Sequence, residues 1–256
     1  QIYQRGVQWI LRGVVQLILY RYINYYLMIG PEDVTNTFEL VRFLIVNFSL
    51  YLRISGQFHL IIGILHLFGF NLPETHHLYF LASSFTDLWR RINIYWKDFM
   101  MKIFFYPTYF RIRNWGATLS LILATTFVFF LTWFLHAYQW FWLRGTFLLT
   151  APDIVFWSIL TVLVVANTLS ENSRGRKRTL GQTSLSMGEI GLLAIRTAVT
   201  FSILALLWSL WSSESIRDWI ALLSVVEFTW ESIFVLLLAF LAIMVVFGLT
   251  IWIGSL

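Results

Sequence analysis

Long uncharged stretches constrain this chain more than any other feature. Residues 117–143 run for 27 positions without Asp, Glu, Lys or Arg, and a helix needs roughly 20 apolar residues to cross a bilayer. Other apolar segments predict spans over residues 7–29, 40–68, 153–169, 188–211 and 232–254. We therefore predict an all-α fold, a polytopic transmembrane helical bundle that forms a single membrane domain over residues 1–256.

The charge content also indicates a membrane environment. Charged residues make up 12% of the chain, against about 25% in soluble domains. The net charge of +5 is typical of membrane proteins, because Lys and Arg collect in their cytoplasmic loops. We expect a lipid bilayer, and no nucleic acid, as partner. The chain has no cysteine, which excludes disulfides and thiolate metal sites.

Residues 78–106 differ from the predicted spans, because charged positions alternate there with apolar and aromatic ones. Helical i, i+4 spacing pairs Asp87 with Arg91, and Asp98 with Lys102. We predict an amphipathic helix or a broken helix pair that is partly embedded and packs on the bundle. We do not expect a single perpendicular span.

Two basic connections define the predicted topology. They cover residues 97–113 and 174–178, and the two spans between them place both on one side. The positive-inside rule makes that side cytoplasmic, so the acidic residues 212–231 lie outside. We expect residues 213–226 to form a helix along the outer interface, with Trp219 and the nearby leucines facing lipid.

His136 is an ionisable residue inside the apolar stretch 117–143, and such residues mark functional sites by default. Thr132 and Trp133 lie one helical turn before it, and Gln139 and Trp140 lie one turn after. A neutral imidazole in this setting is a candidate general base. Alternatively, it only hydrogen-bonds a neighbouring helix, because polar groups also join helices within membranes.

Asn93 lies between two charged segments, and i, i+4 spacing places it on one helix face with Trp89 and Lys97. A carboxamide can donate a hydrogen bond to a developing oxyanion, as acyl transfer requires. Taken alone, an asparagine inside a helix that bonds a neighbouring carbonyl is the simpler interpretation.

Arg90 and Arg91 precede Asn93 directly. Guanidinium groups pair well with the phosphates of nucleotides or lipid headgroups. Neutralisation of Asp87 and Asp98 by these arginines is the simpler alternative, and we favour it on the residues alone.

The remaining histidines invite a metal interpretation: His59, His66, His76 and His77. Glu74 is the one carboxylate near them at ligand spacing, and the chain has no HExxH-like pattern. We therefore expect no metal site and interpret these residues as interfacial histidines.

Small residues recur on the segment that carries two of these histidines: Ser55, Gly56, Gly63 and Gly69. Small side chains let helix backbones approach each other closely in membranes. We expect close helix packing here rather than a phosphate-binding loop.

The motifs in residues 55–94 resemble those of a known family. Ser55-Gly56 and Gly63 precede Leu67-Phe-Gly-Phe70 and Leu72-Pro73, and the block Leu81-Ala-Ser-Ser-Phe-Thr-Asp-Leu-Trp-Arg-Arg-Ile-Asn-Ile94 follows. This series resembles the membrane-bound O-acyltransferase (MBOAT) family, in a branch similar to bacterial alginate O-acetyltransferases and lipoteichoic-acid D-alanyl transferases. His136 occupies the place of the family's central histidine.

The resemblance implies transfer of an acyl group, as in O-acetylation, from a cytoplasmic thioester donor to a hydroxyl of an exported polysaccharide, lipid or similar acceptor. His136 and Asn93 are the implied catalytic residues, and the implied substrate-binding residues are Trp89, Arg90, Arg91, Trp133 and Gln139. The donor is acyl-CoA or an acyl carrier, with no bound cofactor. A periplasmic esterase-like or carrier protein is an expected partner, and the inner (plasma) membrane the expected location. Family members are longer, so we expect the chain to be a C-terminal part that lacks upstream helices.

Departures from the branch support a second hypothesis. The branch has histidine where this chain has Asn93, and it has aspartates where this chain has Arg53 and His59. The alternative is a catalytically silent MBOAT-like membrane scaffold, or a transport or assembly subunit. Transport ranks lower, because matching pairs of broken helices are not evident.

Overall fold

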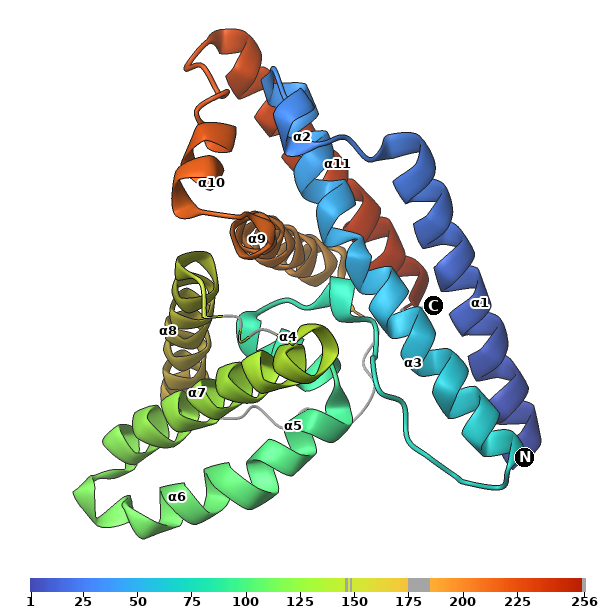
Figure 1. Cartoon of the computed structure of the whole chain (residues 1–256), viewed down its shortest axis with the longest axis vertical. Coiled ribbons are helices and arrows are strands. Elements are labelled where there is room, and N and C mark those ends of the chain that lie inside the picture. Colours follow the sequence, from blue (N-terminus) through green and yellow to red (C-terminus); the bar gives the residue numbers. More distant parts are fainter. Residues whose placement is uncertain (146, 148, 175–184, 255–256) are drawn as a thin grey trace.

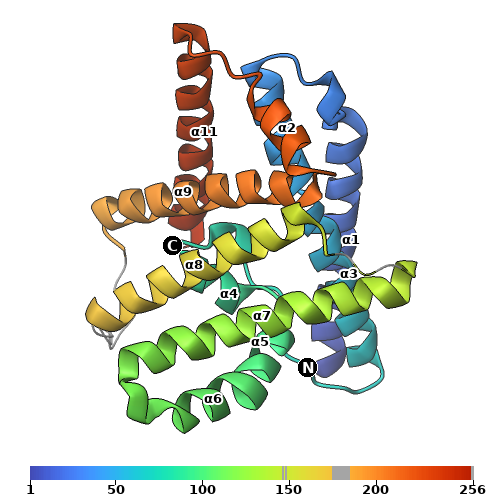
Figure 2. The same ribbon diagram turned by 60° about the vertical axis from the view of Figure 1, so that its left-hand side comes forward.

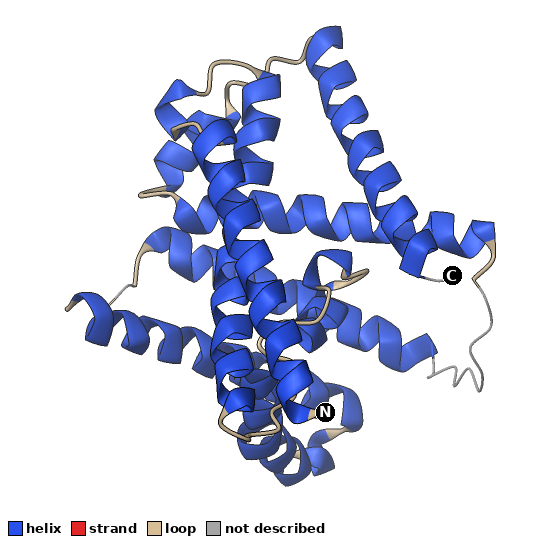
Figure 3. Cartoon of the chain, turned by 90° about the vertical axis from the view of Figure 1, so that its right-hand side faces the viewer, coloured by secondary structure: helices blue, strands red, loops and turns tan. Residues whose placement is uncertain are grey.

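A computed structural model describes residues 1–145, 147, 149–174 and 185–254. Every element within these residues is helical (Figure 3), which confirms the predicted all-α fold. Five helices are long and apolar enough to cross a membrane: Thr37–Leu67, Ala117–Leu143, Ala151–Ser173, Met187–Ser212 and Trp230–Gly254. The chain is therefore a multi-pass helical membrane protein.

Long helices alternate with short ones along the chain. In order they are α1 (Ile2–Leu27), η1 (Pro31–Asp33), α2 (Thr37–Phe48), α3 (Leu50–Leu67), η2 (Tyr79–Leu81), α4 (Phe85–Arg91), α5 (Ile94–Met100), η3 (Met101–Phe105), α6 (Tyr106–Arg111), η4 (Arg113–Trp115), α7 (Ala117–Arg144), α8 (Ala151–Arg174), α9 (Met187–Ser212), α10 (Ile216–Leu223) and α11 (Trp230–Gly254). The second predicted span is thus two consecutive helices, α2 and α3, that join at Ser49.

The long helices form two groups that cross each other. One edge of the molecule is built by α1, α2 and α3, with α11 behind α2 (Figure 1). Helices α7, α8 and α9 lie across this edge and contact one another in order (Figure 2). Because the groups cross, their axes cannot all be parallel to one membrane normal. The short helices α4 and α5 lie between the groups.

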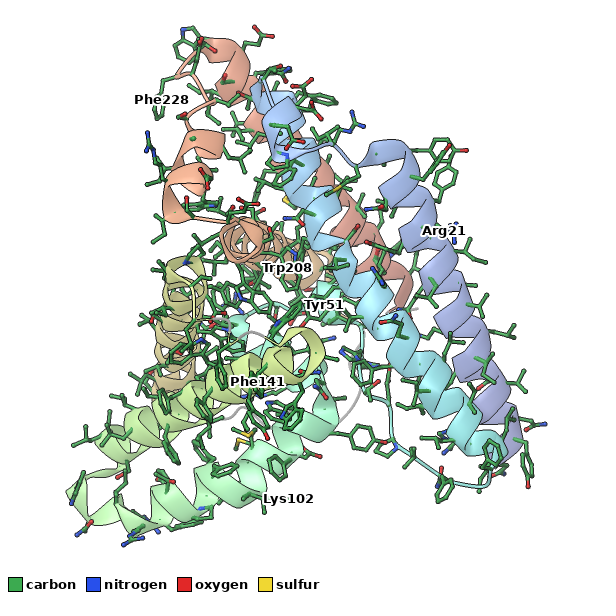
Figure 4. The ribbon with its side chains drawn as sticks, in the orientation of Figure 1. Arg21, Tyr51, Lys102, Phe141, Trp208 and Phe228 are labelled. Carbon is green, nitrogen blue, oxygen red and sulfur yellow. The ribbon has the colours of Figure 1, made fainter. Side chains whose placement is uncertain are left out.

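The first predicted span is helical, but it is not among the five membrane-crossing candidates. Three arginines lower the apolar character of α1: Arg5, Arg12 and Arg21. Arg21 lies on the outer side of α1 (Figure 4). Helix α1 instead makes its main contact with α3.

Glycines allow α1 and α3 to touch through their backbones. A Cβ atom on Gly63 would lie 2.7 Å from the carbonyl oxygen of Gly6, and one on Gly13 would lie 2.7 Å from the carbonyl oxygen of Gly56. Real Cβ contacts are longer, so each position admits only glycine without movement. The predicted close packing is confirmed for Gly56 and Gly63. It is wrong for Gly69, which has a φ of +89° just past the end of α3 and no heavy atom near its Cβ position.

Residues 78–106 form a series of short helices, as predicted, and not one straight span. Ser84 caps α4 by accepting the Asp87 N–H at 3.1 Å. The predicted ion pair between Asp87 and Arg91 forms at 2.9 Å. The predicted pairing of Asp98 with Lys102 is wrong, because Asp98 pairs with the adjacent Lys97 at 2.8 Å.

Helix α10 lies within the predicted interfacial segment, but its orientation differs from the prediction. The indole N–H of Trp219 donates to the Ser209 hydroxyl of α9 at 3.0 Å, and Leu222 is buried against Leu40 and Phe43 of α2. These side chains therefore face protein rather than lipid, because α9 and α2 supply the polar and apolar partners.

The second basic connection of the predicted topology covers residues 174–178. Of these, residues 175–178 lie outside the described residues.

Gly63→Ala should destabilise the protein, because the new methyl group collides with the backbone of α1. The matched control is Gly191→Ala on α9, where no heavy atom lies within 4 Å of the new Cβ. Alanine is favoured over glycine within a helix by about 1 kcal/mol, so the control should be neutral or stabilising. Thermal unfolding in detergent measures both. Equal stability of the two variants would contradict the backbone contact.

Candidate active site

A cavity of about 760 Å³ opens between α3, α4, α5, α7, α8 and α9. Most of its wall is aromatic. Tyr51 and Trp208 lie near the centre of the molecule (Figure 4), with ring centroids 5.4 Å apart. Four of the seven predicted site residues line this cavity: Trp89, Asn93, His136 and Gln139. His136 and Asn93, the two catalytic residues that the resemblance implies, therefore line one cavity.

The ring of His136 has a defined orientation within α7. Its Nδ1 is 2.8 Å from the Thr132 carbonyl oxygen, and because a carbonyl can only accept, Nδ1 carries the proton in this bond. The opposite nitrogen, Nε2, makes no hydrogen bond among the described residues. Trp157 and Trp96 pack against the ring, with centroids 5.3 and 6.0 Å away. A neutral His136 thus presents an unprotonated Nε2.

Asn93 lies at the break between α4 and α5. The prediction that it shares a helix face with Trp89 and Lys97 is wrong, because Asn93 has a φ of +39° and is the residue that caps α5. Asparagine tolerates this left-handed conformation better than most residues. Its Oδ1 accepts the Trp96 N–H at 3.4 Å. This leaves the carboxamide nitrogen without a partner among the described residues.

The break carrying Asn93 is held in place from two sides. The loop after α3 binds it through backbone hydrogen bonds, from His77 N–H to the Arg91 carbonyl and from Ile94 N–H to the Thr75 carbonyl, both at 2.9 Å. On the other side, the Trp96 indole donates to the Thr132 hydroxyl of α7 at 3.3 Å. Thr132 also bonds His136, so one residue of α7 connects the asparagine segment to the histidine.

Three predicted substrate-binding residues do not line the cavity: Arg90, Arg91 and Trp133. Arg90 pairs with Glu171 of α8 at 2.6 Å, and Arg91 pairs with Asp87. The simpler alternative, neutralisation by carboxylates, describes both arginines, although Glu171 takes the place expected for Asp98. Trp133 turns its indole to Asp153.

Asp153 is the site residue that sequence reasoning missed. Its side chain is buried beside the cavity and accepts indole N–H groups from Trp133 at 2.5 Å and Trp211 at 2.7 Å. The signal was weak, because an acidic residue in the first turn of a helix is common. Its position in an apolar segment, with no basic residue in the six positions on either side, is the feature that could have marked it.

The interpretation of the other histidines as interfacial is wrong for three of them. His59 and His66 of α3 and His76 of the loop after it are buried. Helix α1 packs on α3, and the loop approaches α3 where His59 Nε2 lies 3.3 Å from the His76 carbonyl oxygen. His77 has 53% of its side chain exposed. Glu74 binds Arg12 at 2.9 Å and His77 at 2.7 Å. Among the described residues, no three His, Asp or Glu side chains converge as metal ligands would.

His76 belongs to the wall of the cavity, contrary to its interpretation as an interfacial histidine. It is 1% exposed, and its Nδ1 has no hydrogen-bond partner within the part of the chain that the structure describes. Burial, aided by the charges of His59 and Arg12, lowers the pKa of His76 to about 4. His76 is therefore neutral at physiological pH.

Comparison of the chain with protein-family models, with curated proteins and with solved structures finds no match. The resemblance of residues 55–94 and of His136 to O-acyltransferases therefore stays a prediction from sequence motifs. The geometry of the cavity has to be interpreted through the chemistry of its own residues.

The low pKa of His76 predicts a pH-dependent stability. An unfolded histidine binds a proton near pH 6.5 and folded His76 only near pH 4, so the free energy of unfolding should fall as the pH drops from 6.5 towards 4. His76→Phe keeps an aromatic ring and should remove this component. Denaturant unfolding at pH 7.5, 6 and 5 measures it, with exposed His77→Phe as control. A slope in His76→Phe equal to the wild-type slope would show that His76 does not titrate in this way.

Proposed function

We propose that the chain is a membrane-embedded O-acyltransferase that moves an acyl group from a thioester to a hydroxyl. One observation carries the proposal: a histidine with an available Nε2 and an asparagine with an available carboxamide nitrogen line the same apolar cavity. A base for a hydroxyl and a donor for an oxyanion are the two groups that acyl transfer requires.

In the proposed reaction, His136 Nε2 takes the proton from the acceptor hydroxyl. The oxygen attacks the thioester carbonyl, a new C–O bond forms, and the carbonyl oxygen becomes negatively charged. The Asn93 carboxamide donates a hydrogen bond to this oxygen. The C–S bond then breaks, and the thiolate receives the proton from His136. The Nδ1 bond to Thr132 holds the ring orientation through both proton transfers.

The aromatic wall of the cavity also favours the proposed acyl transfer. The side chains around the site include Trp89, Trp96 and Trp157, which leave little polar surface for water. Exclusion of water protects a thioester from hydrolysis and strengthens hydrogen bonds to a developing charge.

We further propose that the donor, acyl-CoA or an acyl carrier, arrives from the cytoplasm and that the acceptor is an exported polysaccharide, lipid or similar molecule. An inner (plasma) membrane location, with an esterase-like or carrier protein as partner, follows from the same proposal.

His136→Gln should abolish transfer while the protein remains folded, because the amide cannot act as a base. Loss of a general base costs about a hundredfold to ten-thousandfold in rate. The assay uses the full chain in lipid nanodiscs with acetyl-CoA as donor and an alginate oligosaccharide as acceptor. Thiol release is read directly, since the chain has no cysteine of its own. His77→Gln, on the exposed histidine, is the matched control.

Two results would contradict the proposal in different ways. Wild-type activity in His136→Gln would exclude this histidine as the base. Absence of thiol release and of acetylated product from the wild-type protein, with acetyl-CoA and with an acetylated carrier protein, would favour the catalytically silent scaffold.

Asn93→Gly tests the carboxamide separately from the backbone. Glycine adopts a φ of +39° without strain, so the junction of α4 and α5 should keep its path. Removal of one oxyanion donor typically lowers kcat by about a hundredfold to a thousandfold. The thiol-release assay measures kcat, and circular dichroism checks the fold. An unchanged kcat in a folded Asn93→Gly protein would limit Asn93 to its role as a helix cap.

A further inference from the structure

Asp153 is a buried carboxylate with two neutral partners. It lies in the first turn of α8 and is 6% exposed. One carboxylate oxygen accepts the Trp133 indole N–H of α7 at 2.5 Å, and the other accepts the Trp211 indole N–H of α9 at 2.7 Å. Asp153 thus links α7, α8 and α9. Both of its hydrogen-bond donors are neutral, so neither compensates the negative charge of the carboxylate.

Among the described side chains, no cation balances this carboxylate nearby. Within the described residues, no Lys, Arg or His nitrogen lies within 4.0 Å of Asp153, whereas Asp87, Asp98 and Glu171 all have one. An unpaired charge in an apolar segment is costly. The positive end of α8 offsets a part of this cost. However, a carboxylate that interacts only with the positive end of its own helix would not need hydrogen-bond donors from α7 and α9.

His136 is the neighbour that can become positively charged. Trp133, which binds Asp153, lies three residues before His136 on α7. Trp157, one turn after Asp153 on α8, packs against the His136 ring with centroids 5.3 Å apart. Asp153 lies close enough for its charge to interact with the imidazole. Trp133 binds the carboxylate and shares α7 with His136, whereas Trp157 contacts the imidazole and shares α8 with Asp153.

The other charged groups on the elements around α7 are paired or lie more than two helical turns from His136 along the chain. Lys97 and Asp98 of α5 neutralise each other at 2.8 Å. Glu171 lies eighteen residues further along α8, about 27 Å away, where it binds Arg90. Arg144 ends α7 eight residues after His136, about 12 Å along the helix, and Arg196 lies on α9, fifteen residues or about 22 Å before Trp211. Three further basic residues lie on the segment that leads into the first turn of α7, nineteen residues or about 28 Å before His136: Lys102, Arg111 and Arg113.

We propose that Asp153 is a positioning residue for His136, and that its carboxylate stabilises the imidazolium which forms when His136 takes a proton. The two indole hydrogen bonds stabilise the ionised form of Asp153 and fix its position. The proton therefore remains on His136 and does not move to the carboxylate. The consequence for catalysis rests on the proposed acyl transfer. The electrostatic link between the two residues does not, and it can be measured in the absence of any substrate.

The test is an NMR titration of the His136 ring in the full chain in lipid nanodiscs, with ring-labelled histidine and His136→Gln to assign the signal. In Asp153→Asn the titration should move to lower pH by about one unit or more, because an opposite charge near a histidine contributes about that much. Thiol release from acetyl-CoA should fall about tenfold or more. Glu171→Gln makes the same acid-to-amide change on the same helix and should leave the His136 titration unchanged.

A second variant separates the charge from a structural role. Trp211→Phe removes one of the two hydrogen bonds that keep Asp153 ionised, so the carboxylate loses part of its charge and the His136 titration should move to lower pH, by less than in Asp153→Asn. It also keeps the proposal testable where Asp153→Asn does not fold. A purely structural Asp153 would change the stability of both variants and the titration of neither.

The outcomes separate this inference from the proposed function. An unmoved His136 titration in both variants overturns the link between Asp153 and His136, whatever the activity. A titration that moves as expected, in a wild-type protein that shows no thiol release, supports the link and overturns acyl transfer.

Discussion

Lipid offers no hydrogen-bond partners, so each polar group at membrane depth must find one within the protein. This constraint explains the bonds around the cavity. His136 donates to the Thr132 carbonyl one turn earlier on its own helix, and Thr132 donates its hydroxyl to Val128 in the same way. Asp153 satisfies its two oxygens with indoles from two other helices. Such bonds leave His136 Nε2 as a polar atom without a described partner, which is what a general base requires.

The break between α4 and α5 determines which side chains share the cavity with His136. A continuous helix would carry Asn93 on a regular face, and its carboxamide would compete with helix hydrogen bonds. The left-handed φ of Asn93 ends α4 and starts α5 in another direction. Backbone bonds from the loop after α3 hold this turn. That loop continues from α3, whose position depends on the glycine contact with α1. The geometry of the cavity therefore depends on packing at a distance from it.

Sequence patterns predicted the parts of the molecule that depend on local chemistry. Apolar length predicted the membrane helices, and small residues predicted the backbone contact through Gly56 and Gly63. Patterns failed where tertiary contacts decide. Spacing alone could not show that α1 covers His59, or that α9 supplies a partner for Trp219. Asp153 was missed because its partners come from residues 20 and 58 positions away. The resemblance predicted His136 and Asn93 as site residues, but only the tertiary structure shows that both line one cavity.

The wall of the cavity also favours one kind of occupant. Trp157 Nε1, Trp208 Nε1 and His76 Nδ1 are buried without a hydrogen-bond partner among the described residues, and all three side chains line the cavity. An unsatisfied buried polar group costs about 1–3 kcal/mol. A hydrocarbon chain would leave this cost in place. Hydroxyl and carbonyl oxygens offer acceptors to the indole N–H groups, and a hydroxyl also offers a donor to His76. These three atoms have almost no accessible surface, so a bound molecule reaches them only when the rings turn into the cavity. Oxygen atoms of a substrate would stabilise such a rotation, whereas a purely apolar lipid tail would not.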